Sequence, residues 1–208
     1  MREPNRLQGT GSWFSDRTGK VTASRMSSAM AFLKNGNEAS ERRKLKIEIL
    51  AERLTGDIIP KYVTQEMQWG IDQEPAAKAA FEAKTGLIVT DIGFVDHPRI
   101  PNCGASPDGL VSDGSLIECK CPSTATHISW MLNGSVPEEY KPQMTLQSAC
   151  MGGKPVWFCS FDPRLPEKQQ LFIRKFQPTE EEIIAVEDAA ERFLEEVEKM
   201  FDLLTKGE

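Results

Sequence analysis

The stretch at residues 104–122, GASPDGLVSDGSLIECKCP, constrains the fold of this chain more than any other part of the sequence. Side chains alternate across a β-strand, so residues two positions apart share a face. A strand at the apolar end of the stretch therefore places Glu118 and Lys120 side by side. The opposite face, directed into a core, carries Ile117, Cys119 and Cys121.

A tight turn in the same stretch predicts a partner for this strand. Asp113-Gly114-Ser115 has the composition of a hairpin turn, which allows residues 109–111 to fold back against residues 115–121. Because Asp108 directly precedes the first arm of this hairpin, we expect its carboxylate to lie close to that of Glu118.

Asp108, Glu118 and Lys120 together form a candidate metal site. Two carboxylates supply hard oxygen ligands for Mg²⁺ or Mn²⁺, and a lysine beside them can hold an attacking water. An edge strand with surface charges after a Pro-Asp-Gly turn explains the same pattern equally well. The pattern alone does not decide between the two interpretations.

The same spacing of two acids and a lysine occurs a second time in the sequence, where it does not predict a metal site. Asp72, Glu82 and Lys84 lie in a segment rich in Ala, Glu and Lys that is typical of a helix. On a helix, residues two positions apart do not face each other, so Glu82 and Lys84 are expected on a solvated surface. The spacing is therefore a weak signal by itself.

The helical segment at residues 64–85 also contains a candidate acid. It is predicted to end at Gly86, and Gly70 and Pro75 predict a break or kink between two pieces. Glu74 stands directly before Pro75, at the predicted break. An acid there caps a helix as readily as it binds a metal, so both roles stay open.

The N-terminal region contains a candidate anion site. Residues 1–12 are polar and expected to be flexible, whereas Thr22 and Ser24 are both acceptable N-caps for a helix that follows. A helix N-terminus with Arg17 and hydroxyl groups nearby favours negative charge, because its N–H groups are unpaired and its dipole end is positive. An ordinary cap with a surface arginine is the alternative.

The remaining pattern predicts an α/β (α+β) fold with a mixed central sheet flanked by helices. Helices are expected at residues 38–54, 127–133 and 137–151, and strands at 87–95, 156–161 and 171–176. An acidic C-terminal helix, 179–208, begins with a capping box of Thr179 and Glu182 and is expected to pack its apolar face on its own domain. Basic residues expected to be solvated, or to contact a DNA backbone, are Arg42, Arg43, Lys44 and Lys46.

Size and composition restrict the possible functions. A chain of 208 residues predicts one domain over residues 1–208. Without a signal-peptide pattern or an apolar run near the roughly 18 residues of a membrane span, a cytosolic protein with no membrane contact is expected. Five cysteines without a Cys-x-x-Cys pair predict buried thiols, and having only His97 and His127 argues against zinc or Ser-His-Asp chemistry.

The net charge of −6 is unevenly distributed. Residues 179–208 carry 11 of the 31 acidic and 3 of the 25 basic residues, a net of −8, which leaves +2 for residues 1–178. The acidic total therefore does not exclude a nucleic acid as partner, because phosphate contact needs only a local basic surface.

Five blocks in order make the chain similar to the phage lambda exonuclease family, recombination nucleases of the PD-(D/E)xK superfamily. They lie within residues 13–164 and read WFSDRTGKVTAS, MQWGIDQEPAAKAAFE, ASPDGLVSDGSLIECKCP, YKPQMTLQSACM and WFCSFDPR. The resemblance implies a restriction-endonuclease-like core. It also implies Mg²⁺-dependent digestion of one strand of duplex DNA from its 5′ end, with Mn²⁺ able to substitute.

By the resemblance, residues at matching positions within these blocks are expected to have the family's catalytic roles. The resemblance implies that Asp108, Glu118 and the backbone carbonyl of Cys119 bind metal, and that Lys120 orients or activates the water. It also places two further side chains at the catalytic site, Glu74 and Gln143.

The resemblance further implies a pocket for the 5′-phosphate of the strand being cut, formed by Arg17, Ser24 and Ser106. Met67 falls where the family has a wedge against the terminal base pair, with a core methionine as the alternative. Thr126 stands where the family has an arginine, which puts one phosphate contact in doubt.

The family also implies partners and a location. Its members form ring-shaped homotrimers on double-stranded DNA ends and work with a single-strand annealing recombinase, here in the cytoplasm of a bacterial host. Rival interpretations are a site-specific or structure-specific endonuclease of the same fold, a non-catalytic DNA-end-binding scaffold, and an unrelated metal-dependent hydrolase. The intact Asp108, Glu118 and Lys120 argue against the scaffold.

Overall fold

A computed structural model describes residues 8–58 and 63–207 of the chain. Its centre is a five-stranded sheet in the order β2-β5-β6-β7-β8. The strands are β2 (Val89–Thr90), β5 (Gly109–Val111), β6 (Leu116–Lys120), β7 (Val156–Phe161) and β8 (Leu171–Phe176). The β6–β7 pair is parallel and the other pairs are antiparallel, so the sheet is mixed, as predicted.

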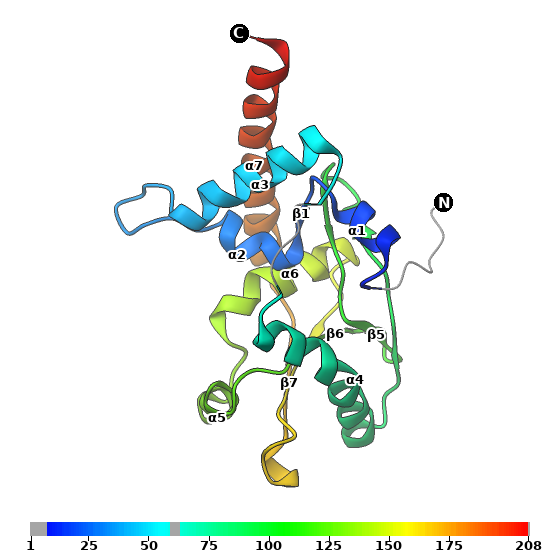
Figure 1. The fold of residues 1–208 in the computed structure, drawn as a ribbon. Coiled ribbons are helices and arrows are strands. Elements are labelled where there is room, and N and C mark those ends of the chain that lie inside the picture. The colour runs from blue at the N-terminus through cyan, green and yellow to red at the C-terminus, as the bar shows by residue number, and fades with distance from the viewer. Residues whose placement is uncertain (1–7, 59–62, 208) are drawn as a thin grey trace.

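Helices cover both faces of this sheet (Figure 1). On one face, α4 (Gln65–Thr85) completes a buried cluster of Ala77, Phe81, Val111, Ile117, Cys119, Cys159 and Phe161. On the other, α5 (Thr124–Asn133) and α6 (Lys141–Cys150) complete a cluster of Leu116, Trp130, Val136, Met144, Val156, Phe158 and Phe172. The predicted fold class is confirmed.

A smaller sheet in the order β1-β4-β3 lies beside the main one. Its strands are β1 (Val21–Thr22), β4 (Cys103–Ala105) and β3 (Val95–Asp96). The single strand predicted at residues 87–95 is wrong, because Val89 pairs with Val111 in the main sheet whereas Val95 pairs with Ala105 in the smaller one. The chain crosses from one sheet to the other between these pairs.

The N-terminal segment is more regular than predicted. Thr10 accepts a hydrogen bond from the Trp13 backbone N at 3.3 Å and so caps α1 (Gly11–Arg17), although residues 1–12 are predicted to be flexible. Residues 1–7 lie outside the described residues. The short helices η1 (Ala23–Arg25) and α2 (Met26–Ala29) follow β1. Thr22 occupies the predicted N-cap position of η1 but makes no capping hydrogen bond through its side chain, whereas Ser24 lies inside η1 and is not a cap.

Helix α4 is continuous through Gly70 and Pro75, so of the predicted break or kink the break is wrong. Thr64 caps it by accepting from the Met67 backbone N at 3.2 Å, and Gly86 ends it in the left-handed conformation at φ 72°. Pro75 lies inside the helix and removes one backbone hydrogen bond. Burial of Ala77 and Phe81 against the sheet offsets this loss and keeps the helix whole.

The helices after β6 also differ from their predicted bounds. α5 begins three residues earlier than predicted because Ser123 accepts a hydrogen bond from the Thr126 backbone N at 3.3 Å. The predicted helix 137–151 starts as the 3₁₀ turn η2 (Glu138–Tyr140) and continues as α6. Another 3₁₀ turn, η3 (Glu167–Gln169), connects β7 to β8.

The long C-terminal helix α7 (Glu180–Lys206) has the predicted capping box of Thr179 and Glu182. It packs on α6 and on α3 (Ser40–Thr55), which confirms packing on its own domain. Its buried apolar residues are Val186, Ala190, Phe193, Leu194 and Val197.

Of the four basic residues of α3 predicted to be solvated, Arg43 and Lys44 are exposed, whereas Arg42 and Lys46 are not. Arg42 is buried and binds Glu196 of α7 through two nitrogens, at 2.7 and 2.9 Å. Lys46 binds the same carboxylate at 2.9 Å. The prediction fails at these two positions because acids of the terminal helix, remote in sequence, neutralise them.

The side chains of the five cysteines and the two histidines lie in environments typical of structural residues. All five cysteines are free and four are buried, with Cys121 partly exposed. His127 is buried and hydrogen-bonds Ser160 Oγ at 2.6 Å, and buried His97 contacts Glu187 Oε1 at 3.0 Å. Within the described ranges, every helix is too short or too polar to cross a membrane.

Candidate active site

The predicted hairpin brings the first two acids together. Asp113 binds Ser115 through its carboxylate, and Gly114 adopts φ 85°, which closes the turn. Gly109 then pairs with Ile117, and the Asp108 backbone N donates to the Ile117 carbonyl at 3.0 Å. This register sets Asp108 opposite Glu118, as the turn chemistry predicts.

The carboxylate of Asp108 is held in place by the neighbouring strand, β6. The Cys119 backbone N donates to its Oδ2 atom at 2.7 Å. Burial, followed by the neighbouring carboxylates of Glu118 and Glu74, raises the pKa of Asp108 well above its ordinary value. A positive charge beside Asp108 would offset this repulsion.

Glu118 is a buried carboxylate that receives three side-chain donors. It is 1 % exposed. Lys120 Nζ lies at 2.5 Å and Gln143 Nε2 at 2.6 Å from Oε1, while Gln147 Nε2 lies at 2.5 Å from Oε2. Burying a charge costs free energy unless the charge is paired and hydrogen-bonded, so these three donors stabilise the buried Glu118 carboxylate.

Gln147 is a site residue that sequence reasoning missed. It follows Gln143 by four positions on α6, and side chains four apart share one helix face. That spacing, once Gln143 is assigned to the site, is the signal that could have identified it. Its Oε1 atom is buried without a hydrogen-bond partner among the described residues.

Lys120 shares the face of Glu118, as the strand alternation predicts. Its ammonium also lies 5.0 Å from the centre of the Tyr140 ring. Burial would lower the pKa of Lys120, but the charges of Glu118 and Asp108 outweigh burial and raise it. Lys120 is therefore a firmly protonated cation beside the two acids.

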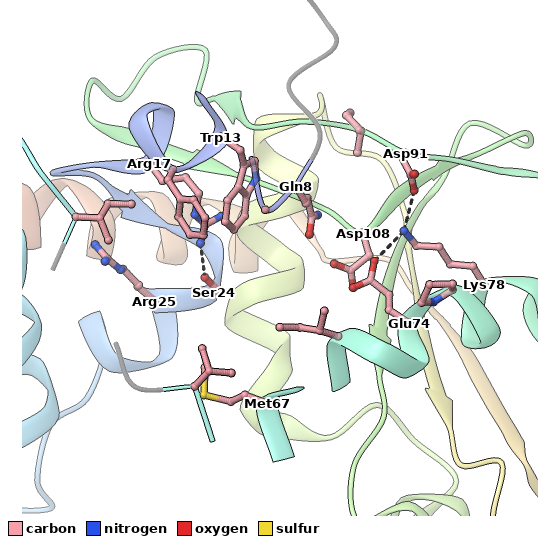
Figure 2. A pocket seen from close by; sticks show the side chains of 17 residues that line it. Gln8, Trp13, Arg17, Ser24, Arg25, Met67, Glu74, Lys78, Asp91 and Asp108 are labelled. Atoms are coloured by element: carbon pink, nitrogen blue, oxygen red, sulfur yellow. Dashed lines mark hydrogen bonds and ion pairs between the residues drawn. The ribbon is translucent and has the colours of Figure 1, made fainter. Parts of the chain in front are cut away.

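Glu74 reaches the same site from α4. It forms an ion pair with Lys78 at 2.8 Å, and Lys78 also binds Asp91 at 2.8 Å. Figure 2 shows the carboxylates of Glu74 and Asp108 turned toward each other. The other Asp/Glu-x-Lys copy is not a site, because Glu82 accepts a hydrogen bond from the Val89 backbone N at 2.7 Å and so connects α4 to β2.

A cavity of about 980 Å³ connects these acids to the N-terminal anion site (Figure 2). Asp108 and Glu74 line one end and Arg17 and Ser24 the other. Glu118 lies behind Asp108 and does not line the cavity. Met67 lies on the wall between the two ends and is 50 % exposed, so the alternative of a core methionine is wrong.

The residues predicted for the candidate anion site lie together. Arg17 donates to Ser106 Oγ at 3.0 Å and to Ser24 Oγ at 3.1 Å. Trp13 stacks on the Arg17 guanidinium, with 4.2 Å from its carbon to the ring centre, and donates its indole N–H to Ser106 Oγ at 3.0 Å. Burial, and then the nearby charge of Arg25, lowers the pKa of Arg17 to about 10.

Two members of the anion site were not predicted as phosphate ligands. Trp13 is one turn before Arg17 on α1, and Thr22 Oγ1 lies 3.4 Å from the Arg17 guanidinium. Thr126, where the family has an arginine, lies in the first turn of α5 and only contributes to its capping. The first turn of α5 contains no arginine or lysine that replaces it.

The donor set fits a magnesium-type ion and not a zinc-type one. No group of three or more His, Cys, Asp or Glu side chains within the described residues is arranged to hold a metal. Mg²⁺ usually binds through one or two carboxylates and keeps several waters, which Asp108 and Glu118 can satisfy. Structural Zn²⁺ requires four protein ligands, mostly Cys and His.

Two acids and a lysine on a hairpin in a mixed sheet, between layers of helices, define a restriction-endonuclease-like protein of the PD-(D/E)xK class. The sequence profile of the YqaJ-like viral recombinase domain matches residues 12–154. The chain therefore belongs to the YqaJ-like viral recombinase family, and its resemblance to the phage lambda exonuclease family is confirmed.

Solved structures agree with this assignment. LHK-Exo, an alkaline exonuclease from Laribacter hongkongensis that has also been crystallised in complex with dAMP, is 40 % identical. It superimposes with a TM-score of 0.88 over 95 % of this chain and 97 % of its own. A phage-related exonuclease from Haemophilus somnus 129PT has the same fold at 14 % identity, with a TM-score of 0.66 over 89 % of this chain and 96 % of its own. Comparison with curated proteins gives no match.

Proposed function

We propose that this protein is a Mg²⁺-dependent exonuclease that digests one strand of linear double-stranded DNA from the 5′ end. Mn²⁺ would substitute for Mg²⁺. The product would be a 3′ single-stranded overhang suited to recombination by strand annealing. The relationship to an alkaline exonuclease supports the reaction class.

The observation that carries the proposal is one cavity with an acidic end and a cationic end. Asp108 and Glu74 lie at the acidic end, and Arg17 lies at the other. A strand whose terminal phosphate bound Arg17 would place an internal linkage near Asp108. An end-dependent nuclease needs this pairing of an end-binding group with a hydrolytic group, and a site that cuts within DNA does not.

The metal ligands would be Asp108, Glu118 and the carbonyl of Cys119. Two divalent ions bound there would activate a water and neutralise the charge that develops on the phosphate and the leaving 3′-oxygen. Asp108 is positioned by the Cys119 N–H, and Glu118 by Gln143 and Gln147. These donors hold the ligand oxygens in place before substrate arrives.

Lys120 would orient the attacking water and hold charge beside the phosphate. The neighbouring carboxylates raise its pKa, which favours the protonated form that donates a hydrogen bond and carries positive charge. Glu74, held by Lys78, would be a further acid at the edge of the metal site.

The cationic end would bind the 5′-phosphate through Arg17, Ser24 and Ser106. Met67, exposed on the wall between the two ends, would act as the wedge that separates the terminal base pair. A fixed terminal phosphate sets the distance to the scissile linkage and so favours cutting from the 5′ side.

The assembly and partners are proposed from the family. The protein would form a ring-shaped homotrimer on a DNA end, in the cytoplasm of a bacterial host. A single-strand annealing recombinase would coat the 3′ overhang that digestion leaves.

Digestion of labelled linear duplex with Mg²⁺ tests the proposal. Substrates labelled at the 5′ or the 3′ end should show loss from the 5′ end, with faster loss from phosphorylated than from hydroxyl ends. Chelation of the metal should stop the reaction. Cutting of a covalently closed circle would instead identify an endonuclease of the same fold.

Lys120→Ala and Lys84→Ala form a matched pair for the catalytic assignment. Both remove a lysine that follows an acid by two positions, but only Lys120 contacts that acid. Lys120→Ala should lower the rate at least about 100-fold, the usual effect of losing one electrostatic catalytic group, while DNA binding persists. Lys84→Ala should digest at the wild-type rate. Equal rates for both variants would contradict the site.

A further inference from the structure

We propose that Glu52, a buried acid on α3 that lines no part of the cavity, is a positioning residue for recognition of the terminal phosphate. It holds Gly19 and Arg25, which flank the segment that supplies Thr22 and Ser24 and that follows Arg17 in the chain. This inference rests on the proposed function, because it assigns the rigidity of the anion site to a residue outside it.

The candidate anion site is formed by two short elements that are joined by a turn. Arg17 ends α1, whereas Thr22 and Ser24 belong to the segment that follows the turn at Gly19. All three side chains meet only if this turn holds one conformation. Gly19 adopts φ 70° there, a conformation that favours glycine.

Helix α3 holds this turn through both backbone groups of Gly19. Glu52 Oε2 accepts from the Gly19 N at 2.9 Å, and the Arg53 guanidinium donates to the Gly19 O at 2.9 Å. A Cβ atom at position 19 would meet the Arg53 side chain at 2.7 Å, so the contact is close as well as polar. The turn is therefore fixed to the last turn of α3.

Glu52 also holds the far side of the segment through Arg25. The two side chains form a two-pronged ion pair, with 2.5 Å from Nη2 to Oε1 and 3.0 Å from Nη1 to Oε2. Arg25 donates further to the Lys20 carbonyl at 3.2 Å. Arg25 directly follows Ser24 and lines the cavity, so this pair fixes the backbone that presents the Ser24 hydroxyl.

The burial of Glu52 is what requires a functional explanation. Its side chain is only 1 % exposed, and a buried ion pair is often no more stable than apolar residues of similar volume. What such a pair does supply is a defined geometry. Beside a cavity with a cationic end, a defined geometry is what discriminates a terminal phosphate from a hydroxyl group.

Binding of DNA ends to Glu52→Gln measures this role. The assay compares duplexes with 5′-phosphate and 5′-hydroxyl ends by fluorescence anisotropy, with Ca²⁺ in place of Mg²⁺ to prevent cutting. Gln keeps an oxygen for the Gly19 N–H but loses the charge that orders Arg25. We expect the preference for phosphorylated ends to fall about tenfold, the loss of one charge-assisted hydrogen bond.

Two further variants make the result decisive. Arg25→Lys keeps the charge and loses the two-pronged geometry, so it should reduce the preference as well. It also serves as the second test if Glu52→Gln does not fold. Glu41→Gln, an exposed acid on the same helix, should keep the wild-type preference.

The outcomes separate this inference from the function on which it rests. A wild-type protein that binds both ends equally would overturn the phosphate site itself. A wild type that prefers phosphate, with Glu52→Gln and Arg25→Lys preferring it equally, would overturn the inference alone. Equal weakening of both ends in the variants would show a purely structural role and would also overturn it.

Discussion

Gln147→Met tests whether the active-site acid Glu118 depends on a donor from α6. The Gln147 side chain is fully buried and donates to Glu118 Oε2 at 2.5 Å. Met has a similar volume and no donor, so the substitution removes the hydrogen bond without creating a large cavity. Any loss can therefore be assigned to the bond and not to packing.

Two terms of opposite sign set the expected magnitude. Loss of a hydrogen bond to a charged group costs about 1.5–3 kcal/mol, but Met also removes the unpartnered Oε1 atom of Gln147 and regains ~1 kcal/mol. The free energy of unfolding should fall by about 0.5–2 kcal/mol. At roughly 2–4 °C per kcal/mol for a chain of this size, Tm falls by about 1–8 °C.

The digestion rate should be affected more strongly than the free energy of unfolding. A metal ligand that loses an outer hydrogen-bond partner typically costs about 10–100-fold in metal affinity or rate. Circular dichroism gives the Tm, and digestion of end-labelled duplex over a series of Mg²⁺ concentrations gives the rate. With Glu118 as the proposed metal ligand, the rate defect should be largest at low Mg²⁺, because a less constrained carboxylate would bind the ion more weakly.

Gln68→Met is the matched control, since Gln68 makes the same kind of bond on an exposed surface. Its Nε2 atom donates to Asp72 Oδ1 at 2.8 Å. That variant should melt within about 1 °C of wild type and retain full activity. A Gln147→Met protein that behaved in the same way would refute the argument that donors from α6 hold Glu118.

Three further predictions concern other parts of the molecule. Burial would raise the pKa of Asp162, but hydrogen bonds from Arg164 and Thr124 lower it from 3.8 to about 2. Its stabilising effect is therefore complete above about pH 4 and lost as the pH falls toward 2, and urea unfolding of Asp162→Asn should lack that dependence. Arg42→Met should lower the free energy of unfolding, measured in urea, by ~3 kcal/mol, because it removes the buried partner of Glu196. An unchanged free energy would contradict this pairing. Met67→Ala should leave Tm within about 1 °C of the wild-type value, because the side chain is half exposed. The same variant should slow digestion of blunt ends several-fold more than digestion of frayed ends. Equal slowing of both would contradict a wedge.

The predictions from sequence succeed where local chemistry decides the structure. The turn at Asp113-Gly114-Ser115 fixes the register of its own hairpin, so the position of Asp108 opposite Glu118 follows from adjacent residues. The capping box at Thr179 and the left-handed glycine at Gly86 are equally local. Each needs no knowledge of the rest of the chain.

The predictions fail where a distant partner outweighs local preference. Pro75 does not break α4, because Ala77 and Phe81 are buried against the sheet. Arg42 is not solvated, because Glu196, 154 positions away, binds it. Sequence spacing carries no information on such pairs.

Helix α6 leaves the protein little freedom to change near its active site. Residues 144–150 are buried without interruption, and the helix contributes to the core beneath α7 as well as to the core beneath α5. A one-residue insertion there would rotate every following side chain by about 100° and turn each buried contact away from its partner. We therefore expect α6 to keep a constant length among functional relatives.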